Sequence, residues 1–370
     1  MKRILQVMSS LHGNGTETAI MNIYRTLDRE KYQFDFLVFD DEEMDFYDEI
    51  KSLGGEIHIV PNRRKSLWGY LRDTWRFFRR NAGRYDAVHL NFCYLSVLWP
   101  FLMAKVSGIP RRIMHSHSSN YVGSKVNLYL HRLFRHADIA LCTDYVACSP
   151  EARDWFYKGT KAMDSCHVVP NGIRLDTFSF NPAIRDQYRR ELGLGDAPVL
   201  GQIGYFSPVK NHRFSIELMK KLRERVPGVK LLFVGKGGDN EQEIFELVQR
   251  EGLDTNIVFL GYRRDVGKLF QAMDMLIHPS LFEGLPLTLV EAQAAGLKVV
   301  ASSTVSKESR FTDNITFLPI DQGVDVWVDT IVKQLGYERK NISQQLIKSP
   351  YNIVNTSKRI ISLYSSSYDT

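Results

Sequence analysis

The run PSLFEGLPLTLVEA, Pro279–Ala292, follows directly on the short apolar run Met275–His278. A short apolar run is typical of a buried strand, and the Gly-Leu-Pro step is typical of a turn that leads into a helix. Proline fits the first turn of a helix, because the N–H it lacks would have no partner there, and Gly296 is placed to end that helix. The stretch therefore predicts a strand, a loop and a helix, which is the repeating unit of parallel α/β sheets.

The same alternation of apolar runs and helix-like segments continues through both halves of the chain. The expected strands of the first half are Ile4–Met8, Phe34–Val38, Ile57–Val60, Ala87–Leu90, Arg112–His115 and Ala140–Cys142. Those of the second half are Val199–Gly204, Lys230–Val234, Ile257–Leu260, Met275–His278 and Lys298–Ala301. The expected helices include Glu17–Leu27, Phe214–Arg225, Glu241–Gly252, Leu287–Ala295 and Ser357–Ser365. We predict an α/β protein with two doubly wound, Rossmann-like domains that face each other across a cleft.

The domain boundary is expected close to a turn in the middle of the chain. A chain of 370 residues is longer than one hydrophobic core usually supports. The turn Pro170-Asn171-Gly172 precedes the expected joint at Phe178–Pro182. We assign residues 1–178 to the first domain and 179–356 to the second, and expect a last helix, about 357–370, to pack back on the first domain.

Positive charge is concentrated in one part of the first domain. The chain has a net charge of +6, but residues 61–137 hold fourteen Lys or Arg and two acids, so this part carries +12 and the remainder −6. Such a patch indicates an anionic partner, for which acidic lipid headgroups and pyrophosphate-linked acceptors qualify by charge, as nucleic acid does. A merely solvated basic face is the alternative.

The segment Arg63–Arg80 mixes basic and aromatic residues. Leu67, Tyr70, Leu71 and Phe78 fall near one face of a helix, which is typical either of a helix in a membrane interface or of one that packs on the domain core. We expect the basic region 63–135 to dock on an anionic membrane and to receive a lipid-linked acceptor there. We do not expect nucleic acid as a partner.

The remaining composition points to the cytoplasm. The sequence shows no secretory signal, and its longest apolar stretch is too short to span a bilayer. The four cysteines show no metal-ligand spacing and are expected to be reduced: Cys93, Cys142, Cys148 and Cys166. We expect a cytoplasmic protein that is peripheral on the inner face of the cell membrane.

Two carboxylates flank the start of the helix that opens near Leu287. Glu283 lies just before it and Glu291 one turn inside it. The N–H groups of a helix amino end suit a diphosphate, and the two carboxylates could grip sugar and ribose hydroxyls on either side of it. An ordinary strand-helix unit with surface acids is the alternative.

This stretch resembles the signature of the retaining GT-B glycosyltransferases of glycosyltransferase family 4, in which a Glu, seven residues and a second Glu follow a Phe-Glu-Gly-x-Pro pattern. The resemblance implies that Glu283 contacts the transferred sugar and that Glu291 holds the ribose of the nucleotide. It further implies that loop amides hold the phosphate and the sugar, here those of Gly284, Leu285, Leu287 and Thr288.

A second similarity lies in the run Gly204–His212. It resembles the family's Gly-Arg-x-x-x-x-Lys-Asn stretch, so Lys210 is expected to neutralise the donor diphosphate and Asn211 to line the site. The family usually has Arg where Tyr205 stands, so either Arg213 or Lys236 supplies the missing charge or the affinity for the donor is lower.

The other similarities concern glycine turns and one histidine. Gly13 and Gly15 follow the first expected strand and resemble the family's glycine loop near the donor phosphate. His117, in the run His115-Ser116-His117-Ser118, aligns with the histidine that the family places beside the reacting sugar. Gly235 and Arg263 sit where the family packs against the base of the nucleotide.

By resemblance the protein is a hexosyltransferase-type enzyme that keeps the anomeric configuration of its donor. We expect a nucleotide-sugar donor with UDP as the usual nucleotide, a glycan or lipid-pyrophosphate-linked acceptor, and a role in exopolysaccharide or capsule synthesis. The sequence has no Asp-x-Asp pair, so we expect no metal and no cofactor, with Lys210 and the helix amino end in the metal's place. A nucleotide-sugar epimerase of the same fold and a catalytically weak nucleotide-sugar-binding protein are the alternatives.

Overall fold

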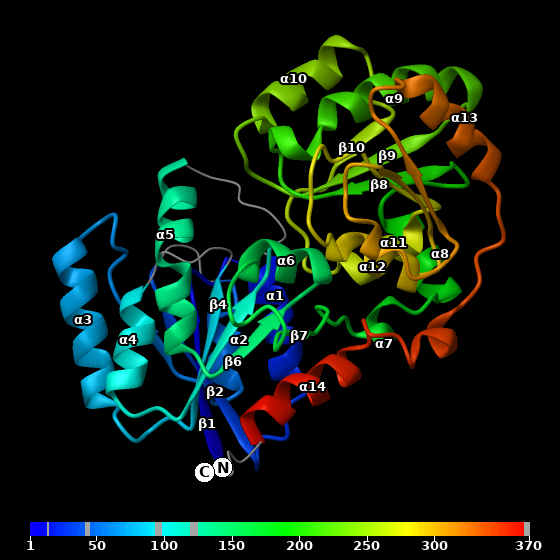
Figure 1. Ribbon diagram of the computed structural model, residues 1–370. Helices are drawn as coiled ribbons and strands as arrows, with labels where there is room; N and C mark the ends of the chain where they lie inside the picture. The colour runs from blue at the N-terminus through cyan, green and yellow to red at the C-terminus, as the bar shows by residue number, and fades with distance from the viewer. Residues whose placement is uncertain (13–14, 41–44, 93–97, 119–124, 366–370) are drawn as a thin grey trace. The chain divides into compact units, whose positions relative to one another are not determined.

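The computed structural model describes residues 1–12, 15–40, 45–92, 98–118 and 125–365 (Figure 1). The chain forms two compact units, one of Met1–Gly172 with Pro350–Thr370 and one of Ile173–Ser349. The first unit thus ends at the Asn-Gly turn, earlier than the expected joint. The short helix α7, Leu175–Phe178, belongs to the second unit, because the Phe178 ring packs 6.0 Å from that of Phe270.

The first unit is built on a seven-stranded parallel sheet of order β3-β2-β1-β4-β5-β6-β7. Its strands are β1 Lys2–Met8, β2 Tyr32–Val38, β3 Ile57–Ile59, β4 Ala87–Phe92, β5 Arg111–Ser116, β6 Asp144–Ala147 and β7 His167–Val168. Its helices are α1 Gly15–Arg25, α2 Tyr47–Ser52, α3 Leu67–Arg80, α4 Leu98–Val106, α5 Lys125–Leu141, α6 Pro150–Tyr157 and α14 Ile353–Ser365. The C-terminal helix α14 therefore belongs to the first unit, where it contacts α1.

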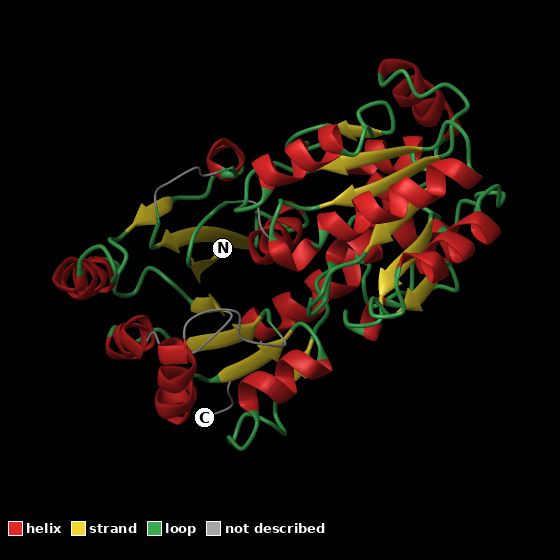
Figure 2. Ribbon diagram, turned by 90° about the horizontal axis from the view of Figure 1, so that it is seen from above, coloured by secondary structure: helices red, strands yellow, loops and turns green. Residues whose placement is uncertain are grey.

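The second unit has a six-stranded parallel sheet of order β10-β9-β8-β11-β12-β13. Its strands are β8 Val199–Ile203, β9 Lys230–Val234, β10 Ile257–Phe259, β11 Met275–His278, β12 Lys298–Ser302 and β13 Ile315–Leu318. Besides α7 it has the helices α8 Pro182–Glu191, α9 His212–Arg225, α10 Glu241–Arg250, α11 Val266–Ala272, α12 Leu287–Ala294 and α13 Val324–Gln334. Three 3-10 turns complete it: η1 Pro208–Lys210, η2 Lys307–Ser309 and η3 Ser343–Leu346. In Figure 2 helices cover the sheet of this unit on both faces, as a doubly wound fold requires.

Alternate strand residues divide the core of the first unit into two layers. One cluster joins Leu5, Val88 and Leu90 with the inner sides of α3 and α4, and the other joins Ile4 and Phe36 with α1 and α14. Figure 1 shows α3, α4 and α5 together beside this sheet. The face of the sheet that contains Ile4 and Phe36 is thus covered by residues from both ends of the chain.

One expected strand was wrong. Ala140–Cys142 was expected to be extended, but α5 runs to Leu141 and the strand that follows is β6. A three-residue apolar run has no period that separates helix from strand, and here Ile139 and Cys142 are buried in the core at the end of the helix. Strands β7 and β13 were not expected. The described cysteines, Cys142, Cys148 and Cys166, are free thiols, and Cys93 lies outside the described residues.

Asp138 of α5 is buried without compensation. It has 0% exposure, and neither carboxyl oxygen has a hydrogen-bond partner among the described residues. Burial raises the pKa of Asp138 to about 7. When the pKa of a carboxyl is higher in the folded state than in the unfolded state, the protein loses stability as the pH rises from the unfolded-state pKa to the folded-state pKa.

We therefore expect the free energy of unfolding to fall by roughly 3 kcal/mol from about pH 4 to pH 8 on account of this group. Asp138→Asn should remove that part of the fall, since the amide does not ionise. Denaturant unfolding of both proteins at several pH values measures the difference. Parallel stability curves for the two proteins would contradict this explanation.

Candidate active site

The loops after β8 and β11 bring a lysine and a glutamate together in the second unit. Lys210 ends the turn η1 after β8, and Glu283 lies in the loop after β11. Lys210 Nζ lies 2.9 Å from Glu283 Oε1. The two loops are joined by a hydrogen bond from the Leu281 N–H to the Val209 carbonyl at 2.8 Å. The carboxyl ends of neighbouring parallel strands are where such sheets bind ligands.

A histidine that the sequence analysis did not single out completes this group. His278, the last residue of β11, places Nε2 2.7 Å from Glu283 Oε1 and is 1% exposed. Burial alone would raise the pKa of Glu283, but His278 and Lys210 together hold it well below its ordinary value. Glu283 is therefore an ionised carboxylate held between Lys210 and His278.

The helix α12 begins four residues after Glu283. Pro286 is its N-cap residue, and no side chain caps its amino end. The amino end therefore carries the partial positive charge of uncapped N–H groups. Leu287 and Thr288 are the first two residues of the helix, and Gly284 and Leu285 lie in the loop just before it. Glu291, half-buried on the next turn, has a pKa raised to about 7 by burial.

Two glycines allow these loops to pack closely. A Cβ on Gly204 would lie 2.8 Å from Lys210 Cε, so the lysine stem lies against that glycine. Gly235 has a φ of 157°, and its Cβ would lie 2.1 Å from the Gly204 carbonyl oxygen. Gly235, expected at the nucleotide base, is thus required in any case for the contact between the loops after β8 and β9. Asn211 is the N-cap residue of α9 and has a left-handed backbone conformation, and its Nδ2 donates to the Pro279 carbonyl at 3.3 Å.

Two of the expected cationic residues are held in ion pairs, whereas Lys236 is exposed. Tyr205 is 53% exposed. Arg213 forms an ion pair with Glu243, and Arg263, expected near the base, donates from Nε to Asp265 Oδ1 at 2.8 Å. Both guanidinium groups are therefore engaged within the second unit.

The residues expected in the first unit lie at the ends of β1 and β5. Gly15 is the first residue of α1, and a Cβ there would meet no atom within 4 Å. Gly13 lies outside the described residues. His117 follows β5, and its Nε2 lies 3.1 Å from Asn91 Oδ1. Burial lowers the pKa of His117 to about 3, although the amide of Asn171 opposes this, so the ring is neutral near pH 7.

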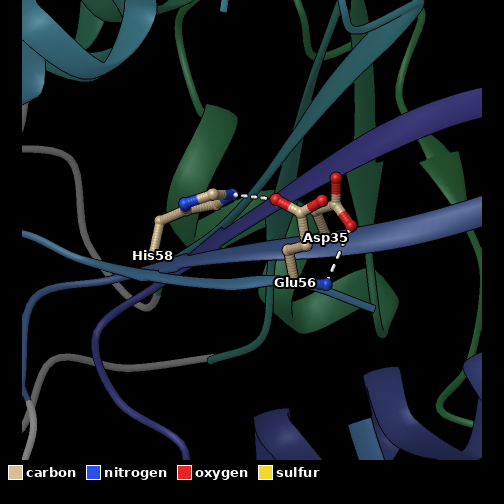
Figure 3. Close-up of side chains that lie close together, drawn as sticks. All are labelled: Asp35, Glu56 and His58. Carbon is tan, nitrogen blue, oxygen red and sulfur yellow. Dashed lines mark hydrogen bonds and ion pairs between the residues drawn. The ribbon is translucent and has the colours of Figure 1, made fainter. Parts of the chain in front are cut away.

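One further group of described residues has metal-ligand geometry, namely Asp35, Glu56 and His58 (Figure 3). Arg3 Nη1 lies 2.7 Å from Asp35 Oδ2, and Arg84 contacts both carboxylates. The hydrogen bond from Arg84 lowers the pKa of Glu56. Two guanidinium groups already balance the two carboxylates, so this group fits an ion-pair cluster better than a cation site.

The outer surface of α3 to α5 combines exposed aromatic and basic side chains. Tyr70 and Phe78 of α3 are buried in the core, so the stripe recognised in the sequence faces inward, except for Leu67. Trp68 is 83% exposed, and Trp75, Tyr129, Leu133 and Phe134 are also exposed. Among the residues that the structure describes, no helix is both long and apolar enough to cross a bilayer.

Comparison with known proteins identifies the family of the chain. Residues 13–177 match the model of Glycosyltransferase Family 4, and residues 184–348 match that of Glycosyl transferases group 1. The protein EpsF of Bacillus subtilis (strain 168), which is named as a glycosyltransferase, is 31% identical over 96% of this chain and 97% of its own length. An Escherichia coli UDP-Gal:α-D-GlcNAc-diphosphoundecaprenol α-1,3-galactosyltransferase is 25% identical over 76% of this chain and 75% of its own.

Solved structures share the whole architecture. Anabaena Alr3699/HepE, solved in complex with UDP, superposes with a TM-score of 0.80 over 99% of this chain and 100% of that one, at 20% identity. TarM superposes with a TM-score of 0.72 over 99% of both chains, at 11% identity. The expected fold, GT-B with two Rossmann-like domains, is confirmed. The chain belongs to the glycosyltransferases that combine a family 4 domain with a group 1 domain.

Proposed function

We propose that this glycosyltransferase transfers a hexose from a UDP-sugar to a hydroxyl of a lipid-linked or polysaccharide acceptor, with retention of the anomeric configuration, in the synthesis of a cell-surface polysaccharide. The observation that carries the proposal is the Lys210–Glu283 pair beside the amino end of α12. The E. coli relative is named for a UDP-sugar donor and a diphosphoundecaprenol-linked acceptor, which supports the same substrate classes here.

The described residues have the properties that this reaction needs. Lys210 and the amino end of α12 would stabilise negative charge on the departing diphosphate without a metal ion. Glu283 would accept hydrogen bonds from hydroxyls of the transferred sugar, and Glu291 from those of the ribose. His117 would contact a hydroxyl of the donor sugar.

Glu283 is poorly suited to a covalent nucleophile. Its carboxylate is already held by Lys210 and His278, and both would have to be released before it could attack carbon. We therefore favour attack by the acceptor hydroxyl on the face that the diphosphate leaves, with the departing phosphate oxygen taking the proton of that hydroxyl.

The assay that tests the function separates it from its alternatives. The protein is incubated with UDP-, GDP- and ADP-sugars, with and without a polyprenyl-diphosphate-linked sugar, in the presence and absence of EDTA. We expect acceptor-dependent UDP release and an unchanged anomeric configuration by NMR. Conversion of the donor without acceptor would indicate an epimerase, and binding without turnover would indicate a nucleotide-sugar-binding protein.

We further propose that the enzyme is cytoplasmic and binds the inner face of the membrane through region 63–135. The exposed Trp68 and the basic residues of α3 have the composition of an interfacial helix. We expect the protein to sediment with anionic vesicles and to be released by salt. Trp68→Ala should weaken vesicle binding by about tenfold, because the variant lacks the tryptophan side chain that would be buried in the membrane interface.

The charge contribution has a matched control. Arg80→Glu on α3 should also weaken vesicle binding, whereas Arg250→Glu makes the same charge change on α10 of the second unit and should not. Equal binding of the protein to neutral and anionic vesicles would rule out the proposed surface.

A further inference from the structure

Five polar side chains interrupt the apolar sheet face that α1 and α14 cover. Gln6 lies on β1, His89 and Asn91 on β4, and His115 and His117 at the end of β5. The register pairs Gln6 with His89 and Asn91 with His115, so all five belong to one face. Buried polar groups cost free energy unless they are hydrogen-bonded, so this stripe requires partners for nearly every atom.

One backbone carbonyl fixes the direction of the hydrogen bonds in this stripe. Asn91 Nδ2 donates to the His89 carbonyl at 3.2 Å and to Gln6 Oε1 at 2.9 Å. Because a carbonyl only accepts, the amide nitrogen of Asn91 must face it, and Oδ1 therefore accepts from His117 Nε2 at 3.1 Å. Gln6 has its oxygen toward Asn91, so its Nε2 donates to the Tyr364 hydroxyl at 3.3 Å.

The hydroxyl of Tyr364 in α14 sets the donor and acceptor roles of the histidine ring nitrogens. Its hydroxyl accepts from Gln6, so its own proton is directed to His89 Nδ1 at 2.6 Å. His89 then carries its proton on Nε2 and donates to His115 Nδ1 at 3.1 Å. Burial lowers the pKa of His89 to about 3 and that of His115 well below its ordinary value. Each ring is therefore neutral and carries one proton, which for His115 is left on Nε2.

The network leaves two ring nitrogens without partners. His115 Nε2 and His117 Nδ1 are buried, and neither has a partner with hydrogen-bond distance and angle among the described residues. The Asn171 amide acts on the His117 ring electrostatically, but it makes no such hydrogen bond to Nδ1. The two rings lie with their centroids 3.9 Å apart, at the carboxyl end of β5. One nitrogen is a donor and the other an acceptor, which is the complement of a single hydroxyl group, since a hydroxyl both accepts and donates.

We propose that Tyr364 is a positioning residue that, through Gln6, Asn91 and His89, fixes the protons of His115 and His117 so that the pair recognises one substrate hydroxyl. This rests on the proposed function, in which that hydroxyl belongs to the transferred sugar. Without the Tyr364 proton the direction from His89 to His115 can reverse, and His115 would then present a bare nitrogen. A buried donor or acceptor without a matching partner costs free energy. Enzyme molecules in the reversed state would therefore bind the substrate hydroxyl less well during the reaction.

Ring-nitrogen NMR on protein labelled with ¹⁵N-histidine tests the proton positions without any substrate. We expect His89, His115 and His117 of the unmodified protein each to carry the proton on Nε2, with signals assigned from single His→Gln variants. In Tyr364→Phe, His89 and His115 should become mixtures of the two tautomers. A proton on Nδ1 of His115 or His117 in the unmodified protein would overturn the proposal, even if the variant failed to fold.

Turnover supplies the second readout, with Tyr32→Phe as the control. The Tyr32 ring lies 6.5 Å from the Tyr364 ring, but its hydroxyl takes no part in the network. We expect Tyr364→Phe to lower kcat roughly tenfold and to change the donor KM by less than about twofold, while Tyr32→Phe resembles the unmodified enzyme. A donor with hydrogen in place of the recognised hydroxyl neither accepts nor donates, and should lose the difference between Tyr364→Phe and the unmodified enzyme.

The two readouts separate this proposal from the proposed function. Normal kcat and unchanged tautomers in Tyr364→Phe would overturn the positioning role and leave the transferase activity standing. Fixed tautomers in a protein that transfers no sugar would overturn the proposed function instead, and with it the link of the network to a sugar hydroxyl.

Discussion

Lys210→Ala is expected to lower kcat by about 10²- to 10³-fold, the range found when a preorganised electrostatic group is removed from an active site. The lysine side chain lies against Gly204 and has Glu283 Oε1 2.9 Å from Nζ. Its removal takes away a positive charge that would balance the departing diphosphate beside the amino end of α12. Steady-state UDP release with saturating acceptor measures the effect.

The control is Lys220→Ala. Lys220 is a partly exposed lysine on α9 that pairs with Glu251 at 2.7 Å, away from the loops after β8 and β11. Lys210→Arg keeps the charge but not the shape of the ammonium group and should fall between the two. An undiminished kcat in Lys210→Ala would mean that another cation, such as Lys236, neutralises the leaving group.

Glu291→Ala is expected to weaken the binding of UDP by roughly 10- to 100-fold, the effect of losing hydrogen bonds to a charged acceptor. Glu291 has a pKa of about 7 in the free protein, because it is buried. In the proposed site ribose hydroxyls would donate to the ionised Glu291 carboxylate, so the affinity for UDP should rise as the pH increases from about 6 to about 8. Isothermal titration calorimetry at several pH values measures both effects.

The variant Glu291→Gln separates the pH dependence that comes from the Glu291 carboxylate from the pH dependence that comes from UDP itself. UDP itself titrates in this range, and the dependence on pH that remains in the glutamine variant belongs to its phosphate. The unmodified protein should show an additional slope. Identical slopes in the two proteins would place the ribose away from Glu291.

The sequence was sufficient for the fold and for the parts of the site that are local in the chain. Glu283 and the start of α12 lie within one strand-loop-helix unit, so their proximity follows from a short pattern. The same reasoning failed at Ala140–Cys142, because a three-residue run has no readable period. The family resemblance gave Lys210 and Glu283 separate roles at one site, but the contact between them was not expected, because they follow different strands of the sheet, β8 and β11.

The parts that were missed depend on distant pairings. His278 is visible in the sequence but reads as the end of a strand, and only the loop geometry directs its Nε2 to Glu283. The hydroxyl of Tyr364 meets Gln6 across 358 positions of the chain. A polar residue at alternate positions of an otherwise apolar strand, as at His89 and Asn91, is the one local sign that such a network exists.

The return of α14 to the first unit limits how the enzyme can be cut and recombined. Ile353, Ile360, Leu363 and Tyr364 complete the core layer that contains Ile4 and Phe36, although they follow the whole second unit in the chain. A fragment that stops at Gly172 would expose that layer to water. It would also leave Gln6 and His89 without their hydrogen-bond partner Tyr364. Chimaeras that exchange the second unit between relatives should therefore carry the first unit as two segments, with the C-terminal helix taken from the same parent as β1.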